Sequence, residues 1–418
     1  MVVTATGCRH TLAVKGTAVG PMLRRAVEKG FGLECASLGE ALHAQAVGCP
    51  PQHIVFDSPC KTRSELAYAL KQGLHLNVDS LEELARLAQI RESLAAETPG
   101  GLKKGTVGLR LNPLCGAGEI ADLSVSVSDS KFGVAGSEEA DILAAFKAHP
   151  WLCGLHVHVG SGAMGLPVLV EGVKACCDLA ARINLHVGRR QVTVMDIGGG
   201  LHPDYRSDTR PPFAEYAALL RKAIPGLLPS EGEEALFDAV VTEFGQALSA
   251  KTGFLASRLE YVKEVRSQGG KAQIAVGHFG ADLCVRQCYT KDHKRRIEFY
   301  DAESCQPVKR ARREAATVTT HLAGPLCFQG DFPARDLEAP PLHPGDFAVM
   351  REAGSNTLSL FSRHCSRFAP AVLGYRLNSG GTAPVVSSLE VLKPFETPAE
   401  LCRFWGTEVA EEQLPDGS

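Results

Sequence analysis

The sequence lacks the features that mark several protein classes. Its 44 basic and 47 acidic residues leave a net charge of −3, so there is no cationic surplus for nucleic acid or an anionic membrane. No apolar run reaches the length of a transmembrane helix, and Met1 to His10 has no secretory-leader pattern. The 14 cysteines include no Cys-x-x-Cys pair and are irregularly spaced, unlike a disulfide framework or a zinc ribbon. We therefore expect a soluble protein of the cytoplasm, with neither nucleic acid nor membrane as a partner.

What is present suits a large folded protein. With 418 residues, 44% of them hydrophobic, the length predicts two or three domains, or one barrel with an addition. From residue 11 to about 245, short apolar runs alternate with segments of helical period, which is the pattern of β-α-β units. Eight such units predict a closed (β/α)8 TIM barrel, with a doubly wound sheet as the alternative. The eight runs are Thr11–Lys15, Gly32–Ser37, His53–Ser58, His75–Ser80, Val107–Pro113, Leu152–Gly160, Val192–Gly200 and Asp238–Gly245.

After about residue 250 the helical period disappears and β-rich stretches replace it. We predict a barrel over residues 1–248, a C-terminal β domain over 249–406 and an acidic tail over 407–418. The basic run Lys309–Arg313 has no interleaved aromatic residues, so we expect a solvated hairpin there rather than a nucleic-acid site. The expected strands are Ile297–Tyr300, Thr317–Leu322, Asp346–Arg351, Ala371–Tyr375 and Val385–Leu392.

Polar residues end the predicted barrel strands, on the side where barrel enzymes build their active sites. Lys15 follows an apolar run, so its amine is expected in the barrel mouth, where desolvation would lower its pKa and create a Schiff-base nucleophile. A lysine whose head simply reaches solvent is the alternative. The run Gly198–Gly200 would let backbone N–H groups approach a phosphate, although a tight turn explains it equally well. The other polar strand ends are Ser37, Asp57, Asp79, Asn112, His158 and Glu243.

Two further motifs have more than one interpretation. His156 and His158 are two positions apart on a strand, which allows a metal pair, a stacking role or interior packing. The eighth strand ends in Glu243 without the Asp that we associate with metal-dependent barrels, so no metal is predicted. Cys327 lies in a turn-rich segment with Asp331, where a buried and inert thiol is the default interpretation.

Several motifs occur in one order along nearly the whole chain. They are Leu12–Gly16 with Leu33–Ser37, Asp129–Gly133, Gly154–Ser161, Asp196–Gly200, Glu243–Gly245, Cys327 with Asp331, and Glu352–Gly354. As a set they resemble the fold-type III pyridoxal-phosphate decarboxylases, the group of diaminopimelate, ornithine and arginine decarboxylases, and diaminopimelate decarboxylases most closely. The resemblance implies an alanine racemase-like architecture of two domains, with pyridoxal 5'-phosphate as cofactor.

The resemblance also implies roles for individual residues. Lys15 would bind pyridoxal phosphate covalently, His158 would pack on the cofactor ring, and Glu243 would pair with the pyridine nitrogen, which keeps the ring an electron sink. Cys327 would reach the neighbouring subunit's site and help to return a proton to Cα, which implies a homodimer with shared active sites. The remaining cofactor contacts would come from Glu34, Ser161, Gly198, Gly199, Gly200, Phe244, Gly245, Gln246 and Asn356, and the substrate contacts from Arg286, Phe328 and Asp331.

The chain departs from the family's pattern mainly where the substrate would bind. Phe328 stands where diaminopimelate decarboxylases have a Glu that recognises the distal amino-acid group. Gln246 and Asn356 replace an Arg and a Tyr of the family. Arg286 lies one residue later, relative to Asp282 and Tyr289, than the corresponding arginine of the family. Only 14 residues precede Lys15, where family members usually have a strand and a helix. We expect α-decarboxylation of a small-molecule amino acid, diaminopimelate or a basic amino acid or derivative. The alternatives are a non-catalytic homologue that regulates a partner decarboxylase as a heterodimer, and an amino-acid racemase of the same fold type.

Overall fold

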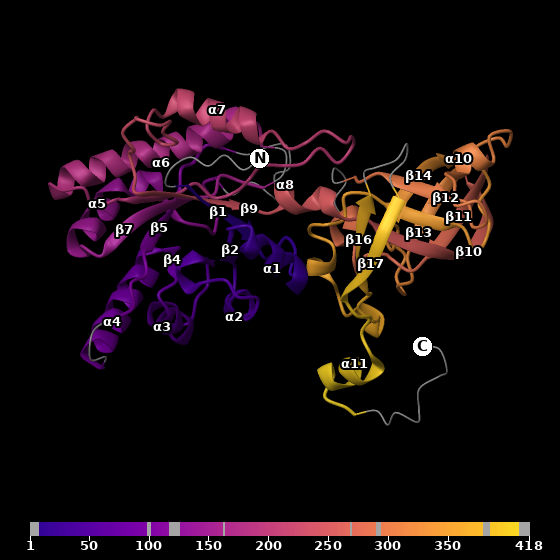
Figure 1. Ribbon diagram of the computed structural model, residues 1–418, viewed down its shortest axis with the longest axis horizontal. Coiled ribbons are helices and arrows are strands. Elements are labelled where there is room, and N and C mark those ends of the chain that lie inside the picture. Colours follow the sequence, from indigo (N-terminus) through magenta and orange to yellow (C-terminus); the bar gives the residue numbers. More distant parts are fainter. Residues whose placement is uncertain are drawn as a thin grey trace. The chain divides into compact units, whose positions relative to one another are not determined.

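The computed structural model describes residues 8–97, 102–116, 126–161, 164–267, 270–289, 294–378 and 385–408 (Figure 1). The chain divides into two compact units. The first contains Met1–Ala18, Leu23–Asp204 and Asp208–Ser249, and the second contains Val19–Met22, Tyr205–Ser207 and Ala250–Ser418. Most of the tail expected over residues 407–418 lies outside the described residues.

The first unit is a closed barrel of parallel strands. Neighbours pair in the order β1-β2-β3-β4-β5-β7-β8-β9, and β9 pairs with β1 to close the ring, with Thr11 opposite Glu243. Each of the eight predicted runs overlaps one of these strands, so the expected (β/α)8 barrel is confirmed and the doubly wound sheet is wrong. The strands are β1 (Cys8–Ala13), β2 (Gly32–Cys35), β3 (Ile54–Asp57), β4 (His75–Val78), β5 (Val107–Asn112), β7 (Leu152–Val157), β8 (Val194–Asp196) and β9 (Ala239–Phe244), while β6 (Val134–Ala135) adds to β5.

Helices between the strands supply the outer layer of this barrel. Strands β2, β3 and β4 are buried at every residue, which requires cover on both faces. Local capping sets where helices begin: the Ser37 side chain accepts from the N–H of Glu40, and Thr62 and Glu65 form a reciprocal capping box. None of the described helices is both long and apolar enough to cross a membrane. They are α1 (Gly20–Glu28), α2 (Leu38–Ala46), α3 (Arg63–Gln72), α4 (Leu81–Glu97), α5 (Glu139–Ala148), α6 (Leu166–Val187), α7 (Phe213–Ala223) and α8 (Gln246–Ser249).

The second unit is built mainly from β-strands, as expected for the C-terminal part of the chain. A six-stranded sheet has the order β12-β15-β10-β11-β13-β14, and β16 pairs with β17 in a separate antiparallel hairpin. Leu259, Phe299, Leu322 and Met350 belong to its buried core. The strands are β10 (Leu255–Ser267), β11 (Gly270–Gly277), β12 (Ile297–Tyr300), β13 (Val318–Ala323), β14 (Ala334–Ala339), β15 (Phe347–Met350), β16 (Val372–Asn378) and β17 (Val385–Lys393), with helices α9 (Val285–Tyr289), α10 (Val308–Ala311) and α11 (Pro398–Phe404).

The basic run Lys309–Arg313 differs from its prediction. It forms most of helix α10 and the turn that follows, so the expected solvated hairpin is wrong. The guanidinium of Arg312 lies 2.6 Å from Asp301 and 2.7 Å from Asp346. This cation is therefore held by two carboxylates of its own unit, which local charge and periodicity could not indicate.

Candidate active site

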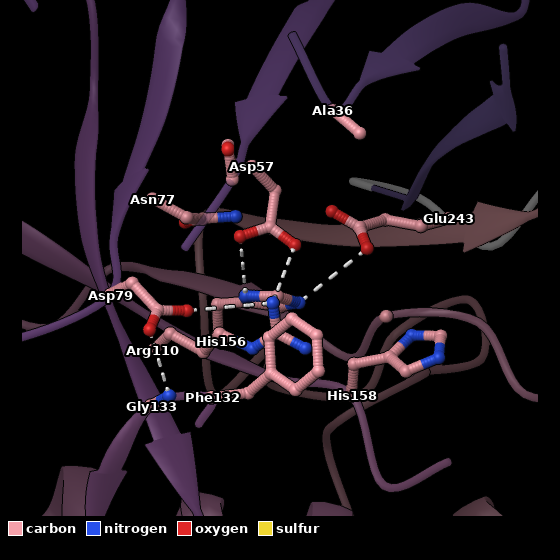
Figure 2. Close-up of polar contacts among 12 residues, drawn as sticks. Ala36, Asp57, Asn77, Asp79, Arg110, Phe132, Gly133, His156, His158 and Glu243 are labelled. Atoms are coloured by element: carbon pink, nitrogen blue, oxygen red, sulfur yellow. Dashed lines mark hydrogen bonds and ion pairs between the residues drawn. The ribbon is translucent and has the colours of Figure 1, made fainter. Parts of the chain in front are cut away.

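The carboxyl ends of the barrel strands bring together a group of buried charged side chains (Figure 2). Parallel strands end at one rim of a barrel, so residues far apart in the sequence meet there. Glu34 comes from β2, Asp57 from β3, Arg110 from β5, His156 from β7 and Glu243 from β9. Each of the five is at most 6% exposed, so each charge depends on its neighbours for compensation.

Lys15 lies at this rim, two residues beyond the end of β1. Its Nζ is 2.6 Å from Oε1 of Glu34, and its side chain is 49% exposed while that of Glu34 is fully buried. Desolvation acts to lower the pKa of Lys15, but Glu34, Glu243 and Asp57 outweigh it and raise the pKa above its usual range. The expected lowering of this pKa is therefore wrong, because the sequence does not reveal how many carboxylates surround the amine.

The carboxyl group of Glu34 has a pKa well above its usual range. Burial raises its pKa to about 8, against the attraction of Lys15 and with added repulsion from Glu243 and Asp57. A carboxyl group with a pKa near neutrality can both accept and release a proton under physiological conditions. Its Oε1 accepts a hydrogen bond from Nζ of Lys15.

Glu243 is a buried carboxylate near the end of β9. Its Oε2 lies 3.5 Å from Nε2 of His156, whereas its Oε1 has no hydrogen-bond partner among the residues that the structure describes. Burial acts to raise the pKa of Glu243, but His156, Lys15 and His158 lower it well below its usual range. One oxygen of a charged carboxylate is thus available to a hydrogen-bond donor.

His158 is held as a neutral ring beside the last turn of the site. The N–H of Gly199 donates to its Nδ1 at 3.1 Å, so the ring proton belongs on Nε2, which lies 2.9 Å from Oγ of Ser161. Burial and the charges of Arg110 and Lys15 lower the pKa of His158 to about 3. The ring therefore stays uncharged at neutral pH and cannot rotate freely.

The Gly198–Gly200 turn follows β8 and has no room for side chains. A Cβ on Gly199 would lie 2.5 Å from the carbonyl oxygen of Glu243, and one on Gly198 would lie 2.4 Å from that of Val157. Gly198 and Gly200 also have φ values of +63° and +98°, which favour glycine. The turn leaves bare backbone at the rim, the kind of surface that approaches an anion closely.

The turn after β9 lies beside β1. A Cβ on Gly245 would come within 3.1 Å of Cβ of Ala13. Phe244 is buried against Phe213 in an edge-to-face contact with ring centroids 5.2 Å apart. Gln246 begins helix α8 and is half-buried. Of these predicted cofactor residues, Phe244 is positioned for packing, while Gly245 and Gln246 lie on the turn itself.

Arg110 forms a network that the sequence analysis did not identify. Its Nη1 lies 3.1 Å from Oδ2 of Asp57 and 3.6 Å from Oδ1 of Asp79, and its guanidinium covers the ring of Phe132 at 4.5 Å. The N–H of Gly133 donates to Asp79 at 3.1 Å. An arginine inside the apolar run of β5 was the available signal, because a buried arginine must be paired. The network ties the Asp129–Gly133 motif to β3 and β4.

His156 and His158 face different partners. Nδ1 of His156 lies 3.7 Å from Asp57, and its Nε2 faces Glu243. These three side chains place possible ligand atoms within 4.8 Å of one another, but their charges already pair. Because His158 contacts Ser161 instead, the arrangement does not fit a metal ion shared by the two histidines.

Cys327 lies in the second unit, on a loop that Asp331 organises. The thiol of Cys327 is exposed, contrary to the default interpretation of a buried cysteine. Asp331 is buried, and its two oxygens accept from the N–H groups of Ala281 at 2.7 Å and Leu326 at 2.6 Å. A direct contact of Asp331 with substrate stays a prediction, and these hydrogen bonds favour a role in holding the Cys327 loop.

The other predicted residues of the second unit are placed as follows. Phe328 stacks on Tyr289, with ring centroids 5.9 Å apart and planes 6° from parallel. Nη1 of Arg286 is buried without a hydrogen-bond partner among the described residues. Asn356 is buried with a φ of +50°, and its carbonyl accepts from Arg295 at 3.4 Å. Arg286 is thus the one of these residues that offers a buried donor.

Three groups at the barrel rim suit three parts of one molecule. An amine suits a carbonyl carbon, an unpaired carboxylate oxygen suits a protonated ring nitrogen, and a glycine turn without side chains lets a phosphate approach the backbone closely. An α/β barrel that carries such an amine, carboxylate and glycine turn, together with a β unit, defines a class of pyridoxal-phosphate enzymes. Residues 6–250 match the family described as "Pyridoxal-dependent decarboxylase, pyridoxal binding domain", and the chain belongs to this family. The predictions of a pyridoxal-phosphate cofactor and of an amino-acid decarboxylase, a carboxy-lyase, are confirmed.

Similar proteins and structures point in the same direction. A diaminopimelate decarboxylase of Pseudomonas aeruginosa is 28% identical over 360 residues, 85% of this chain and 78% of that protein. One of Methanothermobacter thermautotrophicus is 26% identical over 352 residues, 84% of this chain and 76% of that protein. The structure of diaminopimelate decarboxylase from Helicobacter pylori complexed with L-lysine has a TM-score of 0.77 at 22% identity, covering 96% of this chain and 91% of that one. Arginine decarboxylase of Paramecium bursaria Chlorella virus has a TM-score of 0.67 at 20% identity, covering 86% and 87%. These two structures support the fold.

Proposed function

We propose that the protein removes the α-carboxylate of diaminopimelate or a closely related diamino acid, with the reacting groups at the barrel rim. Relatives with diaminopimelate decarboxylase activity align over most of the chain, which supports this substrate class. The observation that carries the proposal is Oε1 of Glu243, a buried carboxylate oxygen without a hydrogen-bond partner among the described residues. The charge of Glu243 pairs with His156, but a buried oxygen without a hydrogen bond is costly, so this atom calls for a donor from a bound molecule.

The residues at the rim fit pyridoxal phosphate. Glu243 would hold the ring nitrogen through its unpaired oxygen, and His158 would lie against the ring. The backbone of Gly198–Gly200, where a Cβ would collide with neighbouring carbonyl oxygens, would hold the phosphate together with Ser161. Lys15 would bind the carbonyl carbon, because its amine lies at this rim beside Glu34 and is half-exposed, whereas that of Lys61 is buried and paired with Glu83.

When bound, pyridoxal phosphate supplies an electron sink for the electron pair left on Cα as CO2 departs. Glu243 would support this role, because His156 and Lys15 keep its carboxylate ionised. The carboxylate can then accept a hydrogen bond from the ring nitrogen. His158 is neutral and adds no competing charge to the ring face. The uncharged ring and the charged carboxylate thus act on different parts of the same cofactor.

Glu34 is the proposed proton acceptor for Lys15. The amine must lose a proton before it can act as a nucleophile, and the three carboxylates around it hold it as a cation. Oε1 of Glu34 lies 2.6 Å from Nζ, and burial raises the pKa of Glu34 to about 8, above that of an ordinary carboxyl group but below that of the Lys15 amine. Glu34 would therefore accept the proton only as the amine forms its bond to the carbonyl carbon.

The substrate half of the site would come from the second unit. We place the exposed thiol of Cys327 near the reacting Cα, as a proton donor, in a homodimer whose subunits share their active sites. Arg286 would bind a carboxylate of the substrate through its buried, unpaired Nη1. The stack of Phe328 on Tyr289 would present an apolar wall to the distal end of the substrate. A cytoplasmic location stays a prediction.

A panel assay tests this function. The purified full chain is supplied with pyridoxal phosphate, and CO2 release is measured from diaminopimelate, lysine, ornithine, arginine and dicarboxylic amino acids while the cofactor absorption band is recorded. We expect a normal band with release from diaminopimelate above all others. A normal band with no release from any substrate would support the non-catalytic homologue, and inversion at Cα without CO2 would support the racemase.

A further inference from the structure

His156 lies between two carboxylates at the centre of the buried charges. Its side chain is fully buried, with Nδ1 3.7 Å from Oδ1 of Asp57 and Nε2 3.5 Å from Oε2 of Glu243 (Figure 2). A neutral imidazole has a single N–H and would turn a lone pair toward one of the carboxylates, whereas an imidazolium has an N–H on each nitrogen. The geometry therefore favours the charged ring.

The groups on the surrounding strands support that charge. Burial alone would lower the pKa of His156, but Asp57, Glu243 and Asp196 outweigh it and raise the pKa to about 9. Arg110 shares Asp57 with His156, and the nearby His75 is kept neutral because burial lowers its pKa to about 4. The titratable groups that interact with the ring are Asp57 of β3, His75 of β4, His158 after β7, Asp196 of β8 and Glu243 of β9. Arg110 of β5 acts through Asp57, while Lys15 and Glu34 act through Glu243 and Asp57.

The charge of His156 bears directly on Glu243. The imidazole lies at ion-pair distance from Oε2, beyond a hydrogen bond, and Oε1 has no hydrogen-bond partner among the described residues. A cation beside a carboxylate makes that carboxylate a weaker base. Without such a cation, burial beside Asp196 would drive Glu243 to take up a proton of its own, as it does for Asp196, whose pKa is raised far above its usual range.

We propose that His156, as an imidazolium, is a positioning residue that keeps the proton shared between Glu243 and pyridoxal phosphate on the cofactor's ring nitrogen rather than on Oε1 of Glu243. The inference rests on the proposed function, because it requires the ring nitrogen to lie at Oε1. When His156 loses its charge, Glu243 becomes the stronger base and the proton moves to Oε1. The ring nitrogen is then neutral, and the electron sink is weaker.

The test reads the protonation of the ring nitrogen directly. Full-length protein is loaded with pyridoxal phosphate carrying 15N in the ring, and the ring nitrogen is followed by NMR across pH. In the wild type we expect a protonated ring nitrogen at neutral pH that loses its proton as the pH rises through about 9, where His156 is neutralised. In His156→Gln the nitrogen should be unprotonated already at neutral pH, with kcat at least about tenfold lower and KM changed less.

His75→Gln is the matched control. It removes another buried imidazole of the barrel interior, one that is neutral, lies 3.9 Å from Asp196 and forms no ion pair with Glu243 among the described residues. Its ring-nitrogen signal should follow the wild type. If His75→Gln shifts the signal as much as His156→Gln does, the effect is a general loss of packing and the inference is overturned.

Two further outcomes separate this inference from the proposed function. If Glu243→Gln leaves the ring nitrogen protonated as in the wild type, Glu243 does not contact it and the proposed cofactor placement fails. If Glu243→Gln removes that proton but His156→Gln keeps the wild-type titration, only the role of His156 is wrong. The wild-type titration needs no variant: if the cofactor nitrogen keeps its proton after the His156 imidazole, followed by 15N NMR in the same sample, has lost its own, the inference is overturned even if His156→Gln does not fold.

Discussion

The barrel rim and the Cys327 loop differ in how their functional side chains are held. At the rim, Glu34, Arg110, His156 and Glu243 are buried and fixed by ion pairs with residues of the same unit. On the loop of the second unit, the backbone is anchored by Asp331, but the thiol of Cys327 is exposed. At the rim the side chains themselves are paired, whereas on the loop the hydrogen bonds of Asp331 hold the backbone.

This difference indicates how the work is divided. Groups that must hold a cofactor benefit from preorganisation, because every donor and acceptor is already in place before binding. Groups that meet a substrate after it enters can remain exposed until then. We therefore expect changes at the rim to alter the cofactor, and changes on the Cys327 loop to alter turnover while the cofactor stays bound.

Lys15→Ala should have the largest effect. Loss of the amine removes the covalent attachment of the cofactor, so CO2 release should fall by about a thousandfold or more. The cofactor absorption band should change at the same time. Lys71→Ala, at an exposed position of α3, should leave both unchanged. A wild-type band in Lys15→Ala would show that another residue holds the cofactor.

Cys327→Ala should lower kcat by about a hundredfold, the scale of a lost general acid, without altering the cofactor band. The comparison predicts this separation because the thiol belongs to the loop rather than to the rim. Cys305→Ala removes another exposed thiol of the same unit and serves as the control. Loss of the cofactor in Cys327→Ala, with turnover per bound cofactor preserved, would break the distinction between the two sites.

Gly199→Ala should weaken cofactor binding by about tenfold or more. The added Cβ would lie 2.5 Å from the carbonyl oxygen of Glu243, and such overpacking costs about 1–3 kcal/mol. Gly39→Ala is the control, because its nearest contact would be 3.7 Å away and alanine is favoured in a helix. Equilibrium titration with pyridoxal phosphate measures both. Equal affinities in the two variants would mean that the turn does not approach the cofactor.

Phe328→Glu should have the smallest effect, and it should raise the activity rather than lower it. A carboxylate in place of the aromatic ring would offer a partner to a distal ammonium group, so turnover of diaminopimelate should rise by several-fold, about 1 kcal/mol in binding. Phe328→Leu keeps an apolar wall and should not gain. Steady-state kinetics on diaminopimelate measure the change, and no gain from the glutamate would remove Phe328 from the substrate pocket.

The sequence predicted the barrel better than the charge network inside it. Strands of the barrel are short, apolar and regularly spaced by helices, so their period was visible. In the second unit, β10 reads as mixed charged and apolar residues over Leu255–Ser267 and was missed, because one of its faces is largely exposed. The edge strand β14 is likewise half-exposed, whereas β11 was missed although most of its residues from Ala272 to Gly277 are buried.

Within the site, local motifs located single residues but not their partners. Their positions at the ends of predicted strands identified Lys15, His158, Glu243 and the glycine turn. The contacts of Arg110 with Asp57 and of His156 with Glu243 each join two alternate strands, whose inward side chains meet only inside the folded barrel. For the same reason the direction of the Lys15 pKa was wrong: three of the groups that raise it come from three other strands.

The central claim is that the barrel rim holds the cofactor through Lys15. The most direct test is to load the full-length protein with pyridoxal phosphate, reduce the complex with borohydride so that the bond to the protein becomes permanent, and map the modified peptide by mass spectrometry. We predict one cofactor per chain, attached to the peptide that contains Lys15. A cofactor attached to another lysine, such as the buried Lys61, or no attachment at all, would contradict the account.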